Sequence, residues 1–318
     1  MKESYEGSSF LVWAAGVVSR GLSLLPRRLK GILFEYALDD DTEPARMFRV
    51  TSRLLTRLNI VEIAAQGRYG IVAGPANDEF VLRQYALEGE FSARISQEIT
   101  QFLADGGTFI DVGANIGLTT IPVAANPRVR CLAFEPEPRN FGFLQRNVRQ
   151  NCPQADVAFH QAALFDRRDT LKLAKAAVNI GDHRINLGVP TQREQVEVPA
   201  LPLDDFLDQL TGPVAVKVDT QGAEPYIVAG GAHVFARAGL VVMEFCPFLM
   251  RQMGGDPGKV LDLIADFPLV ALLAPGNDAA PRYIKGKEAV ALLRDKLANA
   301  AASDGDYLDI IARRAPAA

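Results

Sequence analysis

The sequence contains few of the residues that mark several large classes of protein. Its 318 residues include three cysteines, three histidines and one tryptophan. Cys131, Cys152 and Cys246 are an odd number at wide spacing without a CxxC pair, which argues against a disulfide framework and a cysteine-based zinc site. This cysteine usage predicts a protein of a reducing compartment, the cytoplasm.

Long apolar runs are missing as well. The apolar run at residues 10–18 is too short for a transmembrane helix, which needs about 20 apolar residues. A secretory signal would carry positive charge before this run, where Lys2 stands beside Glu3 and Glu6. We expect a packed amphipathic helix here. Trp13 and the basic residues after the run leave an interfacial helix on an anionic membrane as the alternative.

An excess of basic charge is also absent. The net charge is −4 and the pI is about 5.6, so the chain has no overall attraction for a phosphate backbone, and nucleic acid is not an expected partner. The motifs GxSxG, HExxH and the Walker loop do not occur, which argues against the corresponding hydrolases, metalloproteases and nucleoside triphosphatases. Apolar residues make up 48% and charged residues 23%, as in ordinary soluble enzymes.

The chain divides into two regions by its hydrophobic pattern. Residues 1–90 have a mixed pattern, with an amphipathic helix expected at 47–63 and a strand at 69–73, and we interpret them as a cap or a segment for homo-oligomerisation. From residue 91 onward, short apolar runs alternate with helical stretches, which predicts βαβ units and an open, mostly parallel α/β sheet. The predicted strands are residues 108–112, 129–135, 157–161, 214–219, 240–245 and, at the tail, 307–312.

Helices are expected between these strands. They cover residues 117–125, 138–151 and 223–234, and the second begins with a proline, whose missing N–H costs nothing at a helix start. Residues 166–203 interrupt the alternation with turn residues and β-like segments. We interpret this stretch as a β-hairpin insertion beside the site.

The strongest motif is FIDVGANIGLTT, residues 109–120, in which a buried strand ends in Asp111 and turns into a helix. Gly113 and Gly117 would let the backbone approach a ligand closely. A dinucleotide site is the competing interpretation, but Asn115 stands where the GxGxxG pattern needs its second glycine. Asp111 would repel a pyrophosphate and attract the α-ammonium of S-adenosylmethionine, which favours the latter.

The second motif is CLAFEPEP, where the next strand ends at Glu135. A carboxylate at that position can accept hydrogen bonds from both ribose hydroxyls of a nucleoside cofactor. Ligands of open α/β sheets bind at the carboxyl ends of the strands, so Asp111 and Glu135 are expected to face one crevice.

The third motif is VKVDTQGAE, residues 216–224. Lys217 and Asp219 lie two apart on a strand and therefore point to the same side. Asp219 could be a general base, a metal ligand or an anchor, and a strand-end salt bridge with Lys217 is the structural alternative. Glu244 ends the following strand, so Asp219 and Glu244 form a weaker candidate for a divalent metal site, and a metal requirement stays undecided.

Of the three histidines, His183 alone lies in a polar, glycine-containing segment, NIGDHRIN, where it could act in acid–base chemistry or hydrogen bonding. His160 at a strand end and His233 within a helix are interpreted as structural.

Taken together, DVGANIGLTT, AFEPEPRNFGFLQRNVRQN, VPALPLDDF, KVDTQGAE and VVMEF resemble the FkbM family of S-adenosylmethionine-dependent methyltransferases over about residues 91–248. The resemblance implies the class I methyltransferase fold, a Rossmann-like, mostly parallel seven-stranded sheet with helices on both faces. It also implies O-methylation of a polyketide, sugar or other small-molecule or glycan hydroxyl. An N- or carboxyl-methyltransferase and a non-catalytic S-adenosylmethionine-binding protein are the alternatives.

The resemblance also assigns roles to individual positions. Those expected to bind the cofactor are Asp111, Gly113, Asn115, Gly117, Glu135, Pro136 and Ala163. Asp219 and Glu224 fall on the family's Asp-x-x-Gly-Ala-Glu stretch, in which this chain has Thr220 and Gln221 where many members carry valine and glutamate. The predicted catalytic residues are Asp219, His183 and Glu224.

Overall fold

The structure is a computed structural model that describes residues 43–177, 179–274, 280–299 and 307–314. The helix expected at residues 10–18 lies outside the described residues. The chain forms two compact units, one of residues 1–91 with 177–181 and one of residues 92–176 with 182–318. None of the described helices is long and apolar enough to cross a membrane.

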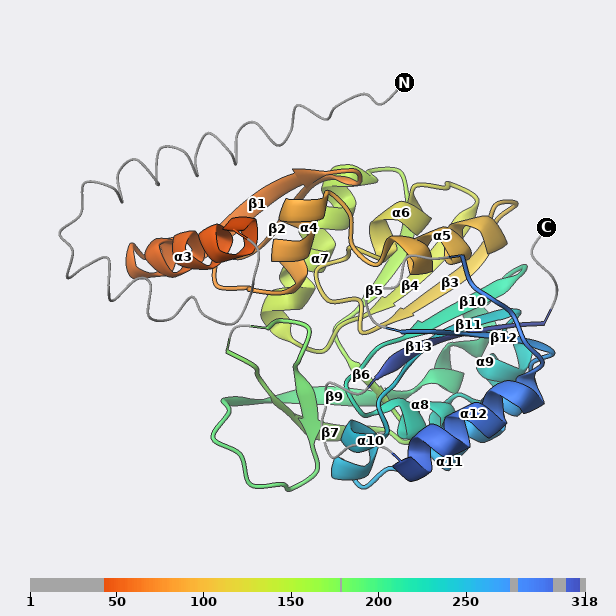
Figure 1. The fold of residues 1–318 in the computed structure, drawn as a ribbon. Helices are drawn as coiled ribbons and strands as arrows, with labels where there is room; N and C mark the ends of the chain where they lie inside the picture. Colours follow the sequence, from red (N-terminus) through yellow and green to blue (C-terminus); the bar gives the residue numbers. More distant parts are fainter. Residues whose placement is uncertain (1–42, 178, 275–279, 300–306, 315–318) are drawn as a thin grey trace. The chain divides into compact units, whose positions relative to one another are not determined.

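The N-terminal unit contains a helix, a hairpin and a second helix (Figure 1). They are α3 (Glu43–Arg57), β1 (Glu62–Gly67), β2 (Gly70–Pro75) and α4 (Val81–Glu88). The Tyr85 hydroxyl of α4 donates to the Gly70 carbonyl and accepts from the Tyr69 amide, which ties the helix to the hairpin turn. The prediction of a helix at 47–63 was wrong at its C-terminal end, because α3 ends at Arg57. Asn59 takes a left-handed conformation, and the chain then continues as β1.

The larger unit is built on a seven-stranded sheet of order β12-β13-β11-β10-β3-β4-β5. Every paired neighbour is parallel except β13, which runs antiparallel to both β11 and β12. This is the class I methyltransferase fold expected from the sequence. The strands are β3 (Gly107–Val112), β4 (Val129–Phe134), β5 (Asp156–His160), β10 (Val214–Val218), β11 (Leu240–Phe245), β12 (Leu269–Leu273) and β13 (Leu308–Arg313).

Helices cover both faces of this sheet (Figure 1). One layer contains α5 (Ala93–Phe102), α6 (Thr120–Ala124) and α7 (Pro138–Asn151). The other contains α8 (Glu224–Gly230), α9 (Ala232–Arg237), α11 (Gly258–Ala265) and α12 (Gly286–Asn299), while α10 (Pro247–Gln252) follows β11. Along β3, Phe109 packs with the first layer and Ile110 with the second, so successive side chains supply two separate cores.

The insertion between β5 and β10 is more than the expected hairpin. Strand β7 (Asp169–Ala174) pairs antiparallel with β9 (Gln195–Pro202), as a hairpin would. The short strands β6 (Ala163–Phe165) and β8 (Arg184–Asn186) extend it into a four-stranded sheet of order β6-β9-β7-β8. A 3₁₀ helix, η1 (Leu203–Gln209), leads from β9 to β10.

Two expected helices differ in extent. Helix α6 begins at Thr120 rather than at residue 117, since Gly117 still has positive φ and belongs to the loop. The helix expected at 223–234 is two helices, α8 and α9, which meet at Gly230 and Gly231. A side chain at Gly230 would strike the Phe165 carbonyl at 2.0 Å, so the close approach of β6 requires glycine there.

Candidate functional site

Three parallel strands of the larger unit end side by side. Val112 of β3 is in register with Phe134 of β4 on one side and with Val218 of β10 on the other. The residues after these strand ends therefore lie at one edge of the sheet, where ligands of open α/β sheets bind. Glu135 and Asp219 come directly after β4 and β10.

The Asp111 carboxylate is used within the protein. It is fully buried, it accepts a hydrogen bond from the Thr120 hydroxyl at 2.7 Å, and it lies 3.3 Å from the Lys217 ammonium. One oxygen thus accepts a hydrogen bond from α6, while the other forms the ion pair with Lys217 on β10 and has no hydrogen-bond partner among the described residues. A direct contact between Asp111 and a cofactor ammonium stays a prediction. The contacts with Thr120 and Lys217 also give Asp111 a structural role in this loop.

The loop after β3 packs directly on the end of β10. Gly113 has φ of 78°, and a Cβ at that position would meet the Asp219 carbonyl at 2.0 Å. The Asp219 amide in turn donates to the Val112 carbonyl. Glycine is thus required here by the approach of the neighbouring strand end, a cause that the sequence did not reveal.

Glu135 connects the first two motifs. One carboxylate oxygen accepts the Asn115 amide at 2.9 Å and the other accepts the Glu137 amide at 2.8 Å. Burial raises the pKa of Glu135 to about 7, against which these amide hydrogen bonds act. Asn115 itself has a left-handed backbone, which turns its amide toward this carboxylate.

The other predicted cofactor positions surround this edge. Pro136 follows Glu135 and is half-buried, Gly117 faces Leu144 of α7 at the end of the same loop, and Ala163 is buried as the first residue of β6. No contact of these three residues distinguishes a cofactor role from a packing role.

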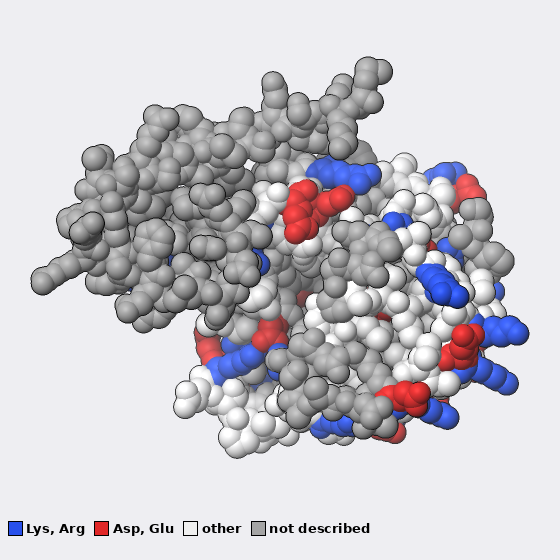
Figure 2. All heavy atoms as spheres, in the orientation of Figure 1, with Lys and Arg blue, Asp and Glu red and all other residues white. Residues whose placement is uncertain are grey.

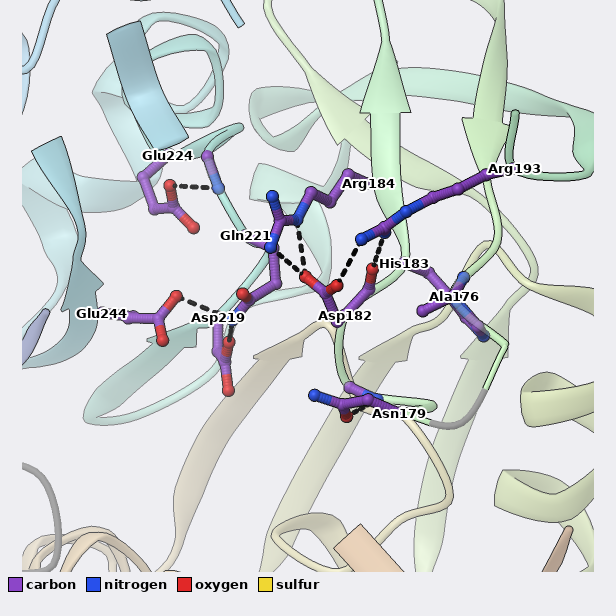
Figure 3. Close-up of polar contacts among 12 residues, drawn as sticks. Ala176, Asn179, Asp182, His183, Arg184, Arg193, Asp219, Gln221, Glu224 and Glu244 are labelled. Atoms are coloured by element: carbon purple, nitrogen blue, oxygen red, sulfur yellow. Dashed lines mark hydrogen bonds and ion pairs between the residues drawn. The ribbon is translucent and has the colours of Figure 1, made fainter. Parts of the chain in front are cut away.

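Asp219 is a candidate catalytic residue that remains accessible. Its side chain is 42% exposed, and its carboxylate lies 3.8 Å from the Lys217 ammonium. The Gln221 amide donates to Asp219 at 3.2 Å and to the buried carboxylate of Glu244 at 2.8 Å, so it joins the two acids (Figure 3). From the sequence, Gln221 was visible only as a departure from the family's Asp-x-x-Gly-Ala-Glu stretch and had no predicted role, although its place in the turn between Asp219 and Glu224 was a signal for one.

Glu224 stabilises the turn that precedes its own helix. It is buried, one oxygen accepts from the amide and hydroxyl of Thr220, and the other accepts from the Gly222 amide. Burial raises its pKa to about 7. These contacts indicate a structural role, and its catalytic role stays a prediction.

Acidic side chains gather around Glu244. Asp309 lies directly opposite Glu244 across the β11–β13 pair. Burial, followed by the charges of Asp219, Glu224 and Asp309, raises the pKa of Glu244 well above its usual value, and burial raises the pKa of Asp309 to about 7. No group of three or more His, Cys, Asp or Glu side chains in the described part of the chain could hold a metal ion.

His183 is placed to donate a hydrogen bond. Its Nδ1 accepts the Ala176 amide at 3.0 Å, so a neutral imidazole carries its proton on Nε2. Burial lowers its pKa, which keeps the ring neutral near pH 7. The adjacent Asp182 carboxylate forms ion pairs with Arg184 and Arg193 (Figure 3). Within the described residues, no hydrogen bond or ion pair joins His183 to Asp219.

The comparisons with known proteins agree with this arrangement. Residues 111–268 match the family model described as the methyltransferase FkbM domain. The chain belongs to the FkbM methyltransferase family. The match begins at Asp111 and contains Glu135, Asp219 and Glu244, and the protein is an S-adenosylmethionine-dependent methyltransferase. A search of curated proteins finds no match.

Solved structures resemble this chain at low identity. A precorrin-6Y C5,15-methyltransferase from Geobacter metallireducens is 14% identical with a TM-score of 0.33, over 68% of this chain and 85% of the other. An rRNA methylase from Streptococcus thermophilus is 8% identical with a TM-score of 0.35, over 69% and 96%. An S-adenosylmethionine-dependent methyltransferase from Agrobacterium tumefaciens is 9% identical with a TM-score of 0.40, over 80% and 71%.

The residues of the FkbM domain fit S-adenosylmethionine by their chemistry. Each Glu135 oxygen accepts one backbone amide, and a carboxylate oxygen has two lone pairs, so one acceptor position on each oxygen remains for a ribose hydroxyl. The amide bond from Asn115 fixes that carboxylate to the glycine loop. Both parts of the predicted cofactor site therefore belong to one hydrogen-bonded unit.

Proposed function

We propose that this member of the FkbM family transfers the methyl group of S-adenosylmethionine to a hydroxyl oxygen of a small-molecule, polyketide or sugar acceptor in the cytoplasm. The observation that carries the proposal is the position of Asp219. Its partly exposed carboxylate follows β10, next to the loop after β3 that bears Asn115. A carboxylate at that edge can take the proton of an acceptor hydroxyl.

Different residues of the protein would bind the cofactor and accept the proton of the acceptor. S-adenosylmethionine, when bound, supplies an electrophilic methyl on its sulfonium. Glu135 would accept the ribose hydroxyls, and the glycine loop would lie along the cofactor. Asp219 would orient the acceptor hydroxyl and accept its proton, and Gln221 would hold that carboxylate by its amide hydrogen bond. His183 would donate a hydrogen bond to the acceptor through Nε2.

Other acceptors are the alternatives. Methylation of an amine would also use a base, whereas a carboxylate acceptor is already ionised at neutral pH and needs none. A non-catalytic cofactor-binding protein would bind the same ligand without turnover. On the face shown in Figure 2, acidic and basic side chains of the described residues are interspersed, which supports a small-molecule or glycan acceptor rather than nucleic acid.

The test begins with the cofactor and proceeds to the acceptor. Calorimetry should show binding of S-adenosylmethionine and S-adenosylhomocysteine, both of which should raise the melting temperature, and Glu135→Ala should weaken both. Incubation with panels of hydroxyl, amine and carboxyl acceptors should form S-adenosylhomocysteine with the hydroxyl panel. Turnover with the amine or carboxyl panel alone would refute a hydroxyl acceptor, and turnover with none would favour the non-catalytic alternative.

The same assay tests the metal. We expect turnover to survive chelation, because the proposed proton transfer uses a protein carboxylate. Magnesium usually retains several waters and could still bind at two carboxylates such as Asp219 and Glu244. Activity that EDTA abolishes and magnesium restores would assign them to a metal.

A further inference from the structure

Lys217 is a buried cation that the proposed mechanism does not use. Its side chain is 8% exposed, and it lies on β10 at the centre of the sheet. A buried ammonium is costly unless its charge is paired and its three N–H groups are bound. Burial alone would lower the pKa of Lys217, but the carboxylates of Asp111, Asp219 and Glu135 reverse the effect and raise it. The ammonium is therefore charged in the folded protein.

The partners of this ammonium lie on two different segments. It donates to the Gly113 carbonyl at 2.8 Å and lies 3.3 Å from the Asp111 carboxylate, both at the β3 end. Its third neighbour, at 3.8 Å, is the Asp219 carboxylate at the β10 end. One side chain thus joins the loop of the cofactor motif to the candidate base.

The backbone at this junction has little freedom. The Asp219 amide donates to the Val112 carbonyl, and the Asp219 carbonyl occupies the space beside Gly113. The Asn115 amide, two residues further along the loop, binds Glu135. A shift of the Gly113 carbonyl would therefore move the Glu135 hydrogen bond as well.

We propose that Lys217 is the positioning residue of the cofactor site, because its ammonium fixes the loop of Gly113 to Asn115 at a set distance from Asp219. The proposal rests on the proposed binding of S-adenosylmethionine at this loop. In this proposal, the buried ion pair of Asp111 and Lys217 holds the loop in the position that binds the cofactor. Charge balance alone is the alternative, in which any neutral replacement of the pair would serve equally well.

The experiment compares three variants of the full chain. Lys217→Met removes the ammonium and keeps most of the side chain, and Asp111→Asn with Lys217→Met replaces the pair by neutral groups. Arg313→Met is the matched control, because Arg313 is also buried and also forms a 3.3 Å ion pair, with Glu98. Arg313 pairs with Leu240 at the start of β11, so it lies at the opposite edge of the same sheet. The dissociation constants of S-adenosylmethionine and S-adenosylhomocysteine are measured by calorimetry, with melting temperatures alongside.

The control and the test variant should differ in binding but not in stability. Lys217→Met and Arg313→Met should both lower the melting temperature. Lys217→Met should weaken cofactor binding by about 10- to 100-fold, the range expected for lost hydrogen bonds to a charged group, while Arg313→Met leaves it unchanged. The double variant should recover melting temperature relative to Lys217→Met, because no charge remains buried alone, but it should not recover affinity.

Several results would overturn the proposal. Unchanged affinity in folded Lys217→Met would reduce Lys217 to a structural residue, and an equal loss in Arg313→Met would mean that destabilisation alone weakens binding. Recovery of affinity in the double variant would favour charge balance, and this outcome would overturn the proposal even if Lys217→Met does not fold. Failure of the wild-type protein to bind either ligand would instead refute the proposed function on which the inference rests.

Discussion

At the scale of single residues, Lys217 on β10 and Asp219 directly after it have different surroundings. The Lys217 ammonium is buried against Asp111, whereas the Asp219 carboxylate reaches the accessible edge of the sheet. The longer of the two distances from the ammonium is the one to Asp219, so Lys217 is mainly the partner of Asp111. The strand-end salt bridge between Asp219 and Lys217, the structural alternative in the sequence analysis, is therefore the weaker of the two ion pairs of Lys217.

The change Asp219→Asn tests the catalytic role of this carboxylate. An alcohol is a poor nucleophile until a base takes its proton, and general-base catalysis contributes on the order of 100- to 10,000-fold. Turnover with an identified hydroxyl acceptor should fall by such a factor, whereas cofactor affinity should change little, since Glu135 and the glycine loop are intact. Single-turnover methyl transfer, calorimetry and thermal melting measure the three effects. A lowered melting temperature with normal turnover would make Asp219 a strand-end anchor.

The candidate site could be predicted from the sequence only in part. Asp111, Glu135 and Asp219 were visible because each ends a short apolar run and such ends meet at one edge of a parallel sheet. The ion pair between Lys217 and Asp111 was not visible, because it depends on the register of two strands more than 100 residues apart in the chain. The sequence offered only the neighbour two positions away, Asp219.

At the scale of elements, the parallel strands and α7 followed from the sequence, while the junctions did not. Helix α7 has the predicted bounds, because Pro138 begins it and Glu137 caps it by accepting the Asn140 amide. Strand β12 was not predicted, since a short apolar run such as LVALL fits a buried strand or a buried helix equally well. The break between α8 and α9 falls at Gly230 and Gly231, where the close approach of β6, a segment distant in sequence, leaves no room for a side chain at Gly230.

Two glycine-to-alanine substitutions, one in the loop after β3 and one inside α7, should have opposite effects on stability. Gly113→Ala should destabilise the protein and weaken cofactor binding, because its Cβ would strike the Asp219 carbonyl at 2.0 Å and its φ is 78°. Gly142→Ala is the matched control within α7, where an added Cβ meets nothing within 4 Å. It should raise stability by about 0.5–1 kcal/mol, the helix preference of alanine over glycine.

Chemical denaturation and calorimetry on both variants give the comparison. The expected signs are opposite for stability, and a change in cofactor affinity is expected for Gly113→Ala alone. A Gly113→Ala protein as stable as the wild type would contradict the tight contact between the loop and the end of β10.

At the scale of the whole molecule, buried carboxyl groups should make stability depend on pH in an unusual direction. Burial raises the pKa of Glu135 and Glu224 from 4.5 to about 7 and that of Asp309 from 3.8 to about 7. Between the unfolded and folded pKa values, the folded state keeps protons that the unfolded state has released. The free energy of unfolding is therefore highest below the unfolded pKa values and falls as pH rises through about 7, by up to about 1.4 kcal/mol per pH unit for each group.

Histidines oppose this trend at lower pH. Burial lowers the pKa of His160 and His183 below 6.5, so the stability that they contribute above that value is lost as pH falls. The melting temperature should accordingly rise as the pH is lowered from about 8 to about 6.5, where the carboxyl groups act alone, and the rise should weaken below that range. Glu224→Gln should reduce the change of melting temperature with pH, because it removes one titrating carboxyl group. It should also lower the melting temperature at every pH, because it loses contacts in the turn.

Asp208→Asn, which changes an exposed carboxylate on η1, is the control and should leave the pH dependence of the melting temperature as in the wild type. A melting temperature that falls steadily from about pH 8 to about pH 6.5 would mean that these carboxyl groups are ionised in the folded protein at neutral pH, and Glu135 would then present a full negative charge to the ribose site.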